Sequence, residues 1–352
     1  MKPSLCIDAR MLFSSGIGTY IRNIIPYIEP FFQITLLAKK TEIERVKKFY
    51  SCHVVGINSS IYSFKEHFVL PYKIPKVDLF WSPHYNIPLL PIRAKKRIVT
   101  IHDVCHLAMP EFFSKLKRPI VRFLIKQAVK RSDLIFTVSS FSLQEMVKFL
   151  CLEEKEKNKV KVVYSGVEKK RYSDKISLEE RNLKAPFVLY VGNLKPHKNI
   201  KRLLEAFLLL PSTYELVLAG RNFMDEALFS HPRIKLLGEV DDEVLSSLYQ
   251  KAKVLVQPSL YEGFGLTPLE AMQAGCPVVS SPKGGLVEAS RGAAFYINPL
   301  DVSSLAEGIK EVLENAQLRS RLIQSGFQRV EEASWEKTGN TIKDLLLQEA
   351  FS

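Results

Sequence analysis

The sequence predicts an α/β protein built from two Rossmann-like domains that face a central cleft, and two observations carry this prediction. The chain of 352 residues, 46% of them hydrophobic, is too long for one ordinary core and fits two domains of about 100–200 residues each. Short β-rich runs alternate with helical patterns along the whole chain, which is typical of parallel sheets with helices on both faces. The charged stretch 168–184 is poor in large apolar residues and is the best candidate for a linker.

Strand candidates can be assigned in order along the chain. Six precede the linker: Leu5–Ile7, Ile34–Leu37, Leu79–Trp81, Ile98–Ile101, Leu134–Val138 and Lys161–Tyr164. Five follow it: Phe187–Val191, Glu215–Ala219, Ile234–Leu237, Val254–Gln257 and Pro277–Ser280. Helical periodicity separates many of these strands and is clear at Ile200, Leu203, Leu204 and Phe207. Because ligands of such sheets bind at the carboxyl ends of the strands, the turn after each strand is where functional residues are expected.

Composition excludes several classes of protein. The five cysteines, Cys6, Cys52, Cys105, Cys151 and Cys276, are scattered and form no Cys-x-x-Cys pair, which argues against zinc frameworks and disulfide scaffolds. The longest apolar runs fall far short of the roughly 20 residues that a membrane-spanning helix needs. We therefore expect a reduced, cytoplasmic protein.

Charge is unevenly distributed between the two halves of the chain. The formal net charge is +13. Residues 1–175 carry 31 Lys and Arg against 15 Asp and Glu, which is a net +16, whereas residues 176–352 carry 19 against 22, which is a net −3. This asymmetry predicts an anionic partner for the first half, and nucleic acid, an anionic membrane surface or an acidic substrate would each fit.

One segment, residues 115–131, concentrates the positive charge, with seven Lys and Arg and no acidic residue. Four of the basic residues recur every four positions and share one helical face: Arg118, Arg122, Lys126 and Lys130. Apolar residues fill the other face: Ile120, Val121, Leu124, Ile125, Ala128 and Val129. The same periodicity fits a surface helix packed on the core and a basic amphipathic helix lying on anionic lipid, so both interpretations stay open.

Two turns in the first half have functional potential. Gly16 and Gly18 form a glycine loop before a helical pattern, where backbone N–H groups can approach an anion, although an ordinary turn explains the loop as well. The pair His102-Asp103 follows a hydrophobic strand, and it either serves a site at the cleft or only caps a turn.

Two turns in the second half carry a stronger signal. In Gly192 to Asn199 a strand ends at glycine, Asn199 is a candidate helix cap, and Lys198 next to a helix N-terminus is typical of a phosphate site. In Glu262 to Glu270, Thr267 as N-cap, Pro268 and Glu270 fit a capping box. The preceding glycines also free the backbone for an anion, and the two carboxylates suit a polyhydroxyl ligand that carries phosphate.

Taken together and in this order, these segments resemble retaining GT-B glycosyltransferases of family four. Glu262 to Glu270 is similar to that family's E-x7-E motif, and Gly192 to Asn199 is similar to its diphosphate loop. Because Gly16 to Thr19 and His102-Asp103 also fall where the family has similar segments, the likeness spans nearly the whole chain. The segment Gly192 to Asn199, with the sequence Gly-Asn-Leu-Lys-Pro-His-Lys-Asn, most resembles the same segment in family members that act on GDP-mannose.

The resemblance implies a role for each motif. Lys198 would bind the donor diphosphate, Glu270 the ribose hydroxyls, and Glu262 the transferred sugar. His102 would contact that sugar near the reacting centre, so the catalytic set is His102, Glu262 and Lys198. The implied donor-binding set is Gly16, Gly18, Asn193, Lys198, Phe264, Gly265, Leu266, Thr267 and Glu270. The family often has arginine where this chain has Asn193, so Lys195 or Arg221 are further candidates to stabilise the leaving group.

The expected activity is retaining transfer of a hexose, with mannose from GDP-mannose favoured, onto a glycan or lipid-linked acceptor in cell-surface polysaccharide synthesis. No cofactor and no metal are expected, because the family usually works without a bound metal and the sequence has no Asp-x-Asp. The resemblance implies an acceptor-side domain over 1–175, a donor domain over 176–335, and a last helix, about 336–352, that packs back on the first. If residues 115–131 bind lipid, the enzyme lies on the inner face of the membrane.

Two alternatives remain at this level. A nucleotide-sugar epimerase would share the architecture, and acceptor-dependent transfer separates the two activities. A non-enzymatic protein that binds polyanions or nucleic acid would fit the isoelectric point of about 9.4. However, the chain lacks interleaved aromatic and basic residues, so no nucleic acid is expected as a partner.

Overall fold

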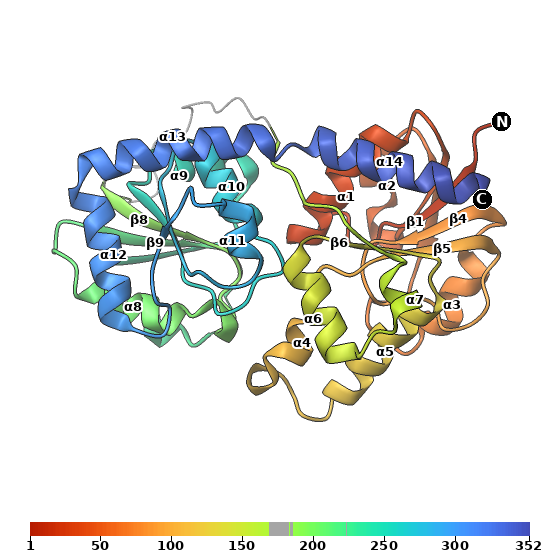
Figure 1. The fold of residues 1–352 in the computed structure, drawn as a ribbon, viewed down its shortest axis with the longest axis horizontal. Helices are drawn as coiled ribbons and strands as arrows, with labels where there is room; N and C mark the ends of the chain where they lie inside the picture. Colours follow the sequence, from red (N-terminus) through yellow and green to blue (C-terminus); the bar gives the residue numbers. More distant parts are fainter. Residues whose placement is uncertain (169–182, 184–185, 223) are drawn as a thin grey trace. The chain divides into compact units, whose positions relative to one another are not determined.

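The computed structural model describes residues 1–168, 183, 186–222 and 224–352. The chain divides into two compact units. Unit 1 consists of Met1–Gly166 and Trp335–Ser352, and unit 2 consists of Val167–Ser334. Most of the expected linker, residues 169–182 and 184, lies outside the described residues, as does the expected boundary after residue 175. Each unit contains one sheet flanked by helices (Figure 1).

The sheet of unit 1 has seven parallel strands in the order β3-β2-β1-β4-β5-β6-β7. The strands are β1 (Ser4–Asp8), β2 (Gln33–Lys39), β3 (His53–Ile57), β4 (Val77–Ser82), β5 (Ala94–Thr100), β6 (Leu134–Thr137) and β7 (Val160–Val162). All six strand candidates of the first half are confirmed. The edge strand β3 was not predicted, because it begins with an exposed histidine and contains a glycine, so it forms no continuous apolar run.

Helices cover both faces of this sheet. They are α1 (Ser15–Ile28), α2 (Ile43–Phe49), α3 (Glu66–Lys73), α4 (Cys105–Ala108), α5 (Arg118–Arg131), α6 (Ser140–Leu150), α7 (Glu154–Lys157) and α14 (Trp335–Phe351). In Figure 1, α1, α2 and α14 lie on one face, and α3, α5 and α6 lie on the other. Helix α14 packs closely on α1, since a Cβ added at Gly339 would lie 2.3 Å from the Tyr27 ring.

The sheet of unit 2 has six parallel strands in the order β10-β9-β8-β11-β12-β13. The strands are β8 (Phe187–Val191), β9 (Glu215–Ala219), β10 (Ile234–Gly238), β11 (Val254–Gln257), β12 (Val278–Ser280) and β13 (Phe295–Tyr296). The helices are α8 (Ile200–Leu208), α9 (Asp242–Lys251), α10 (Leu266–Gln273), α11 (Gly285–Ser290), α12 (Val302–Glu314) and α13 (Ala316–Glu332). The five predicted strands are confirmed, whereas β13 has only two residues and gives no pattern to predict it from.

Two glycines let the ends of β8 and β9 approach each other. Gly192 and Gly220 both have positive φ angles, of 146° and 137°. A Cβ added at Gly220 would lie 2.0 Å from the carbonyl oxygen of Gly192, so no other residue fits there without moving the backbone. This contact holds the loop that begins at Gly192 at the carboxyl end of the sheet.

Both sheets have the strand order of doubly wound folds. The order reverses between β1 and β4 in unit 1 and between β8 and β11 in unit 2. Ligands of such sheets bind in the crevice at this reversal, outside the carboxyl ends of the strands. The prediction of an α/β fold with two parallel Rossmann-like sheets is therefore confirmed.

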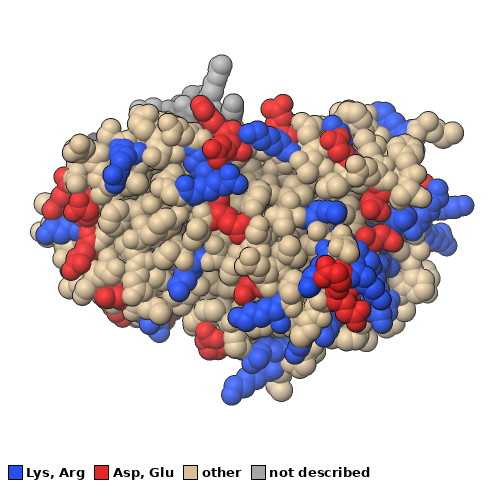
Figure 2. All heavy atoms as spheres, viewed as in Figure 1, with Lys and Arg blue, Asp and Glu red and all other residues tan. Residues whose placement is uncertain are grey.

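The outer surface of unit 1 carries much of the positive charge. Basic side chains gather along the lower edge of the molecule in Figure 2, where Figure 1 places α4 and α5. Among the described residues, no helix combines the length and the apolar character needed to cross a membrane.

Candidate active site

The site in unit 2 is centred on an ion pair between Lys198 and Glu262. Lys198 follows β8, Glu262 follows β11, and these neighbouring strands flank the point at which the strand order reverses. The Lys198 Nζ lies 2.6 Å from Glu262 Oε1, and the two side chains are only 14% and 15% exposed. The residues that the resemblance assigns to the diphosphate and to the transferred sugar are therefore in direct contact.

The carboxylate of Glu262 is held by donors from the end of β11. Gln257 Nε2 and Ser259 Oγ each donate a hydrogen bond of 2.9 Å to Oε1, the atom that also contacts Lys198. Burial alone would raise the pKa of Glu262, but the lysine charge and the three donated hydrogen bonds outweigh burial and lower that pKa. Glu262 is therefore an anion at neutral pH. Sequence reasoning missed Gln257 and Ser259, although both are polar residues at the end of a buried strand.

Asn199 fixes the lysine loop by a route that differs from the predicted cap. It directly precedes α8, but its side chain makes no capping hydrogen bond, and its backbone is left-handed with φ at 63°. Its Nδ2 instead donates to the carbonyl oxygens of Pro258, at 3.1 Å, and Pro299, at 2.6 Å. In addition, the amide of Leu260 donates to the carbonyl of His197. These bonds tie the loop that carries Lys198 to the loop that carries Glu262.

The predicted capping box at Glu270 is wrong. Helix α10 begins at Leu266, and its N-cap is Gly265, with φ at 125° and no side-chain hydrogen bond. Thr267 is therefore already inside the first turn, and Glu270 lies too far along the helix to cap it. The Glu270 Oε2 instead accepts a hydrogen bond of 2.9 Å from the Tyr249 hydroxyl on α9. The carboxylate therefore contacts α9 and does not cap α10, and the ribose role that the resemblance implies stays a prediction.

The helix start at Gly265 places the amides of Leu266 and Thr267 in the first turn of α10, where backbone N–H groups have no helical partner. Such amides attract anions. Phe264, just before them, is buried at 5% exposure. Gly265 itself packs closely, since an added Cβ would lie 2.8 Å from the Leu286 side chain. The helix start is thus rigidly placed beside the loop of Glu262.

Asn193 stands at the start of the lysine loop. Its carbonyl accepts a hydrogen bond of 3.0 Å from the buried Tyr190 hydroxyl. Burial, and then the charge of Glu262, raises the pKa of Tyr190, so this hydroxyl stays a donor. Asn193 Oδ1 is buried and has no hydrogen-bond partner within the described part of the chain. Lys195 and Arg221, the two further candidates to stabilise the leaving group, lie on neighbouring loops. The Leu194 amide joins these loops by donating to the Arg221 carbonyl at 2.9 Å.

In unit 1 the glycine loop differs from the prediction. Helix α1 begins at Ser15, so Gly16 and Gly18 lie within its first turns and not in a loop before it. A Cβ added at Gly18 would lie 2.6 Å from the Leu12 carbonyl oxygen, so the packing of the chain on itself requires this glycine. Gly16, by contrast, has open space where a Cβ would stand. Of the two, only Gly16 has room for a side chain.

His102 lies two residues after the end of β5 and is held on both sides. Its Nε2 lies 3.0 Å from the Pro83 carbonyl oxygen, which makes Nε2 the protonated nitrogen. The backbone carbonyl of His102 accepts a hydrogen bond of 2.8 Å from Ser142 Oγ. Its ring packs edge-on against Tyr20 at 4.9 Å. Burial lowers the pKa of His102, so the ring is neutral at pH 7 and Nδ1 is its acceptor.

A buried charge network that the sequence analysis did not predict lies between β1 and β4. Arg10 contacts Asp8 Oδ2 at 2.7 Å and Glu66 Oε2 at 2.8 Å, and all three side chains are buried. His84 Nε2 lies 3.2 Å from Asp8 Oδ2. Although burial opposes it, Arg10 lowers the pKa of Asp8. The network fixes the chain on both sides of the strand-order reversal in unit 1.

The residues of the predicted site fall into two groups. Lys198, Glu262 and Glu270 belong to unit 2, with the helix start at Leu266, whereas Gly16, Gly18 and His102 belong to unit 1. The central cleft that would join the groups stays a prediction. No three His, Cys, Asp or Glu side chains of the described residues come together as a metal site.

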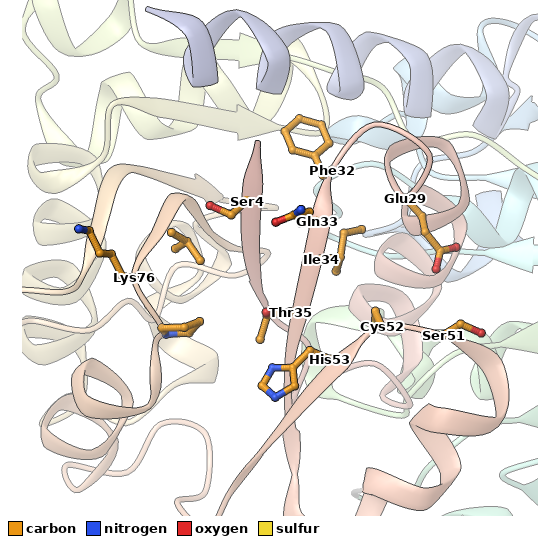
Figure 3. A pocket seen from close by; sticks show the side chains of 12 residues that line it. Ser4, Glu29, Phe32, Gln33, Ile34, Thr35, Ser51, Cys52, His53 and Lys76 are labelled. Carbon is orange, nitrogen blue, oxygen red and sulfur yellow. The ribbon is translucent and has the colours of Figure 1, made fainter. Parts of the chain in front are cut away.

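A cavity of about 520 Å³ lies elsewhere in unit 1, at the amino ends of the strands (Figure 3). Gln33, Cys52, His53 and Lys76 are among its lining residues, and none of the predicted site residues lines it. Burial and the charge of Glu29 raise the pKa of the Cys52 thiol to about 11, so this cysteine is not a reactive thiolate. The predicted site residues of unit 1 lie at the opposite edge of the sheet, where the strands end.

Comparison of the whole fold with solved structures places it in a known class. The structure of Alr3699/HepE from Anabaena in complex with UDP-glucose is similar, with a TM-score of 0.79 at 18% identity. The likeness covers 98% of this chain and 100% of that one. With two parallel Rossmann-like sheets that match this structure over nearly the whole chain, the fold is of the GT-B class.

Sequence comparison identifies the family within this class. The profile of glycosyl transferases group 1 matches residues 173–329. The O-antigen chain mannosyltransferase B of Escherichia coli is 31% identical over 262 residues, which is 70% of this chain and 69% of that protein. The O-antigen chain mannosyltransferase RfbU of Salmonella typhimurium is 32% identical over 248 residues, which is 68% of this chain and 66% of that protein. The chain belongs to the glycosyl transferases group 1 family. Neither the epimerase nor the nucleic-acid-binding alternative is favoured.

Proposed function

We propose that this glycosyltransferase moves mannose from GDP-mannose, with retention at the anomeric carbon, onto the glycan or lipid-linked acceptor of a cell-surface polysaccharide. The observation that carries the chemistry is the buried pair of Lys198 and Glu262 beside the start of α10. The sugar is supported by the two relatives named as O-antigen mannosyltransferases.

The leaving group sets the main chemical demand. When the bond between the anomeric carbon and the phosphate oxygen breaks, the electron pair stays on the diphosphate and the sugar becomes oxocarbenium-like. The Lys198 ammonium and the amides at the start of α10 supply fixed positive potential for the diphosphate. The acceptor hydroxyl attacks on the same face and passes its proton to the departing phosphate oxygen. This mechanism uses no bound metal, so EDTA is expected to leave the rate unchanged.

Two carboxylates complete the donor site in this proposal. Glu262, kept anionic by Lys198, accepts hydroxyl hydrogen bonds from the transferred sugar. Glu270 accepts from the ribose hydroxyls while the Tyr249 hydroxyl holds the other side of the carboxylate. His102, neutral and with Nδ1 as acceptor, accepts a hydrogen bond from a hydroxyl of the sugar near the reacting carbon.

The donor is tested by adding GDP-mannose, GDP-glucose, UDP-glucose and UDP-galactose separately to the full chain and measuring thermal stability. A ligand that binds the folded state raises the melting temperature by mass action. GDP-mannose is expected to give the largest shift, and product analysis by NMR is expected to show an α-linked mannoside. A larger shift with a uridine nucleotide sugar, or a product with inverted configuration, would contradict this part of the proposal.

The membrane contact that we propose for residues 115–131 is narrower than the sequence suggested. Ile125, Ala128 and Val129 of α5 are buried in the core, so they cannot enter lipid. The apolar side chains that are exposed are Leu116, Ile120 and Phe123, at 84%, 59% and 52%. They alternate with exposed basic residues, which is the pattern of a helix that lies on an anionic surface.

Each basic residue near an anionic membrane contributes about 1 kcal/mol. Replacing Arg118, Arg122, Lys126 and Lys130 with Gln is expected to release the protein from vesicles that contain phosphatidylglycerol. Transfer to a soluble acceptor should stay unchanged. Replacing Ile120 and Phe123 with Ser should weaken vesicle binding without altering its salt dependence. If the parent protein does not bind such vesicles at low salt, the membrane proposal is wrong, and the net charge of +16 on residues 1–175 needs another explanation.

A further inference from the structure

Four aromatic rings form a continuous row at the carboxyl edge of the sheet in unit 1. Ring centroids lie 5.7 Å apart between Tyr62 and Tyr85, 6.4 Å between Tyr85 and His106, and 4.3 Å between His106 and Phe113. Tyr62 is 53% exposed, and the other three side chains are half-buried. This aromatic row is thus a surface that a ligand can reach, unlike the rings of the core.

A carboxylate accompanies the rings. Asp103 is half-buried and accepts a hydrogen bond of 2.9 Å from the Cys105 amide. Asp103 follows β5 and stands three residues before His106 of the row. A charged acceptor therefore accompanies the rings in the turn after β5.

The position of Tyr62 is held by the fold at a local cost. Its φ angle is 65°, in the left-handed region that a tyrosine rarely occupies, and such strain persists where the surroundings determine the backbone. Its ring lies 6.3 Å from that of His84, which in turn contacts Asp8 in the buried charge network. The aromatic row thus rests on a rigid base and does not need to form when a ligand arrives.

The aromatic row also lies where a ligand of this sheet is expected. His84 follows β4 and Asp8 ends β1, so their contact spans the strand-order reversal of unit 1. Pro83 accepts the hydrogen bond from His102, and His106 comes four residues after His102. The row and the histidine that we assign to the reacting centre therefore share the turns after β4 and β5.

A row of rings with a carboxylate matches the chemistry of a saccharide. One face of a pyranose presents C–H groups, which pack on the negative face of an aromatic ring, while its hydroxyls donate well to a carboxylate. We propose that the aromatic row, together with Asp103, is an acceptor subsite that binds the pyranose rings of a saccharide chain. This inference rests on the proposed transfer function, because it names the acceptor of that reaction.

The subsite is tested by saccharide binding to the full chain without any donor. α-Mannotriose, maltotriose and N-acetylchitotriose serve as probes, and saturation-transfer NMR with titration gives their affinities. At least one probe is expected to bind through its C–H protons. Tyr85→Leu should weaken that binding about tenfold, whereas Tyr85→Phe, which keeps the ring, should stay within about twofold. If none of the probes binds at millimolar concentration, the proposal is overturned.

A second variant removes a ring without endangering the fold. Tyr62→Gly places glycine at a left-handed position, so its thermal stability should equal or exceed that of the parent while saccharide binding weakens. Tyr72→Ala is the matched control, because Tyr72 is a 78% exposed tyrosine of unit 1 outside the aromatic row. Binding that is equal in Tyr62→Gly, Tyr85→Leu and the parent would overturn the subsite.

The donor proposal can fail separately. Saccharide binding that depends on Tyr62 and Tyr85, in a protein that transfers nothing from GDP-mannose, would support the subsite and refute the donor. Transfer from GDP-mannose with an unchanged acceptor KM in Tyr85→Leu would support the donor and refute the subsite. Tyr85→Leu is expected to raise the acceptor KM about tenfold and to leave the donor affinity unchanged.

Discussion

Replacing Lys198 with alanine is the most direct test of the site in unit 2. The change removes an ammonium that lies 2.6 Å from Glu262 Oε1, with both side chains about 85% buried. A hydrogen bond to a charged group contributes on the order of 1.5–3 kcal/mol, so the loss of the same cation from the departing diphosphate should lower kcat roughly tenfold to hundredfold. Because the charge develops during departure, kcat should fall more than donor affinity.

The same variant has a stability signature that follows from the ion pair. Without Lys198 the Glu262 carboxylate keeps its bonds from Gln257 and Ser259 but loses its cation, so its pKa should rise and the fold should be destabilised at pH 7. Protonation of Glu262 relieves this loss, and the difference from the parent should therefore shrink on acidification. Adding Glu262→Gln to the variant should recover much of the lost stability.

The assay is steady-state transfer from GDP-mannose, together with thermal unfolding at pH 7 and near pH 5. Lys201→Ala is the matched control, since Lys201 is an exposed lysine of the adjacent helix α8. We expect the control to behave as the parent in both measurements. A folded Lys198→Ala protein with unchanged kcat would refute the assignment of this loop to the diphosphate.

Three further outcomes can be stated briefly. Glu270→Gln should lower donor affinity about tenfold, because an amide oxygen binds ribose hydroxyls less strongly than a carboxylate does. The melting temperature should change little, because the amide oxygen still accepts from Tyr249. Equal donor affinity of variant and parent by calorimetry would refute the ribose role. Gly220→Ala should destabilise unit 2 by more than about 2 kcal/mol in urea unfolding, because its Cβ meets the Gly192 carbonyl and its φ is positive. Because the folded-state pKa of Glu262 lies below the ordinary value of 4.5, the free energy of unfolding should fall as pH drops below about 4.5, and Glu262→Gln should reduce this fall.

The sequence predicts the sheets well because central strands of parallel sheets are buried on both faces. Phe187–Val191 is a continuous apolar run and Val254–Gln257 is apolar up to its last residue, and the structure gives both strands the predicted bounds. Lys198 and Glu262 could be selected for a related reason, since each stands in the turn after one of these strands. Position relative to a strand end is a local property, and a single sequence contains it.

Contacts between turns are not local, and there the prediction fails. The direct bond from Lys198 to Glu262 joins residues 64 positions apart, and the partner of Arg10 on α3, Glu66, is 56 positions away, so no spacing rule reveals either contact. The capping box at Glu270 fails for a different reason. Gly265 adopts a positive φ and starts α10 earlier than the Thr-Pro pair suggests, and a one-letter pattern does not show that choice.

Helix α14 has a consequence for how the protein is made. Unit 2 is one continuous stretch, whereas unit 1 needs α14, which follows unit 2 in the chain. All of unit 2 is therefore synthesised before α14, the last part of unit 1. Unit 1 is completed after unit 2, although N-terminal domains generally fold first during synthesis. Trp335 packs on Tyr20, and Tyr20 packs on His102. A nascent chain thus lacks the full surroundings of His102 until α14 has been synthesised, so unit 1 completes its core only after the whole of unit 2 has been made.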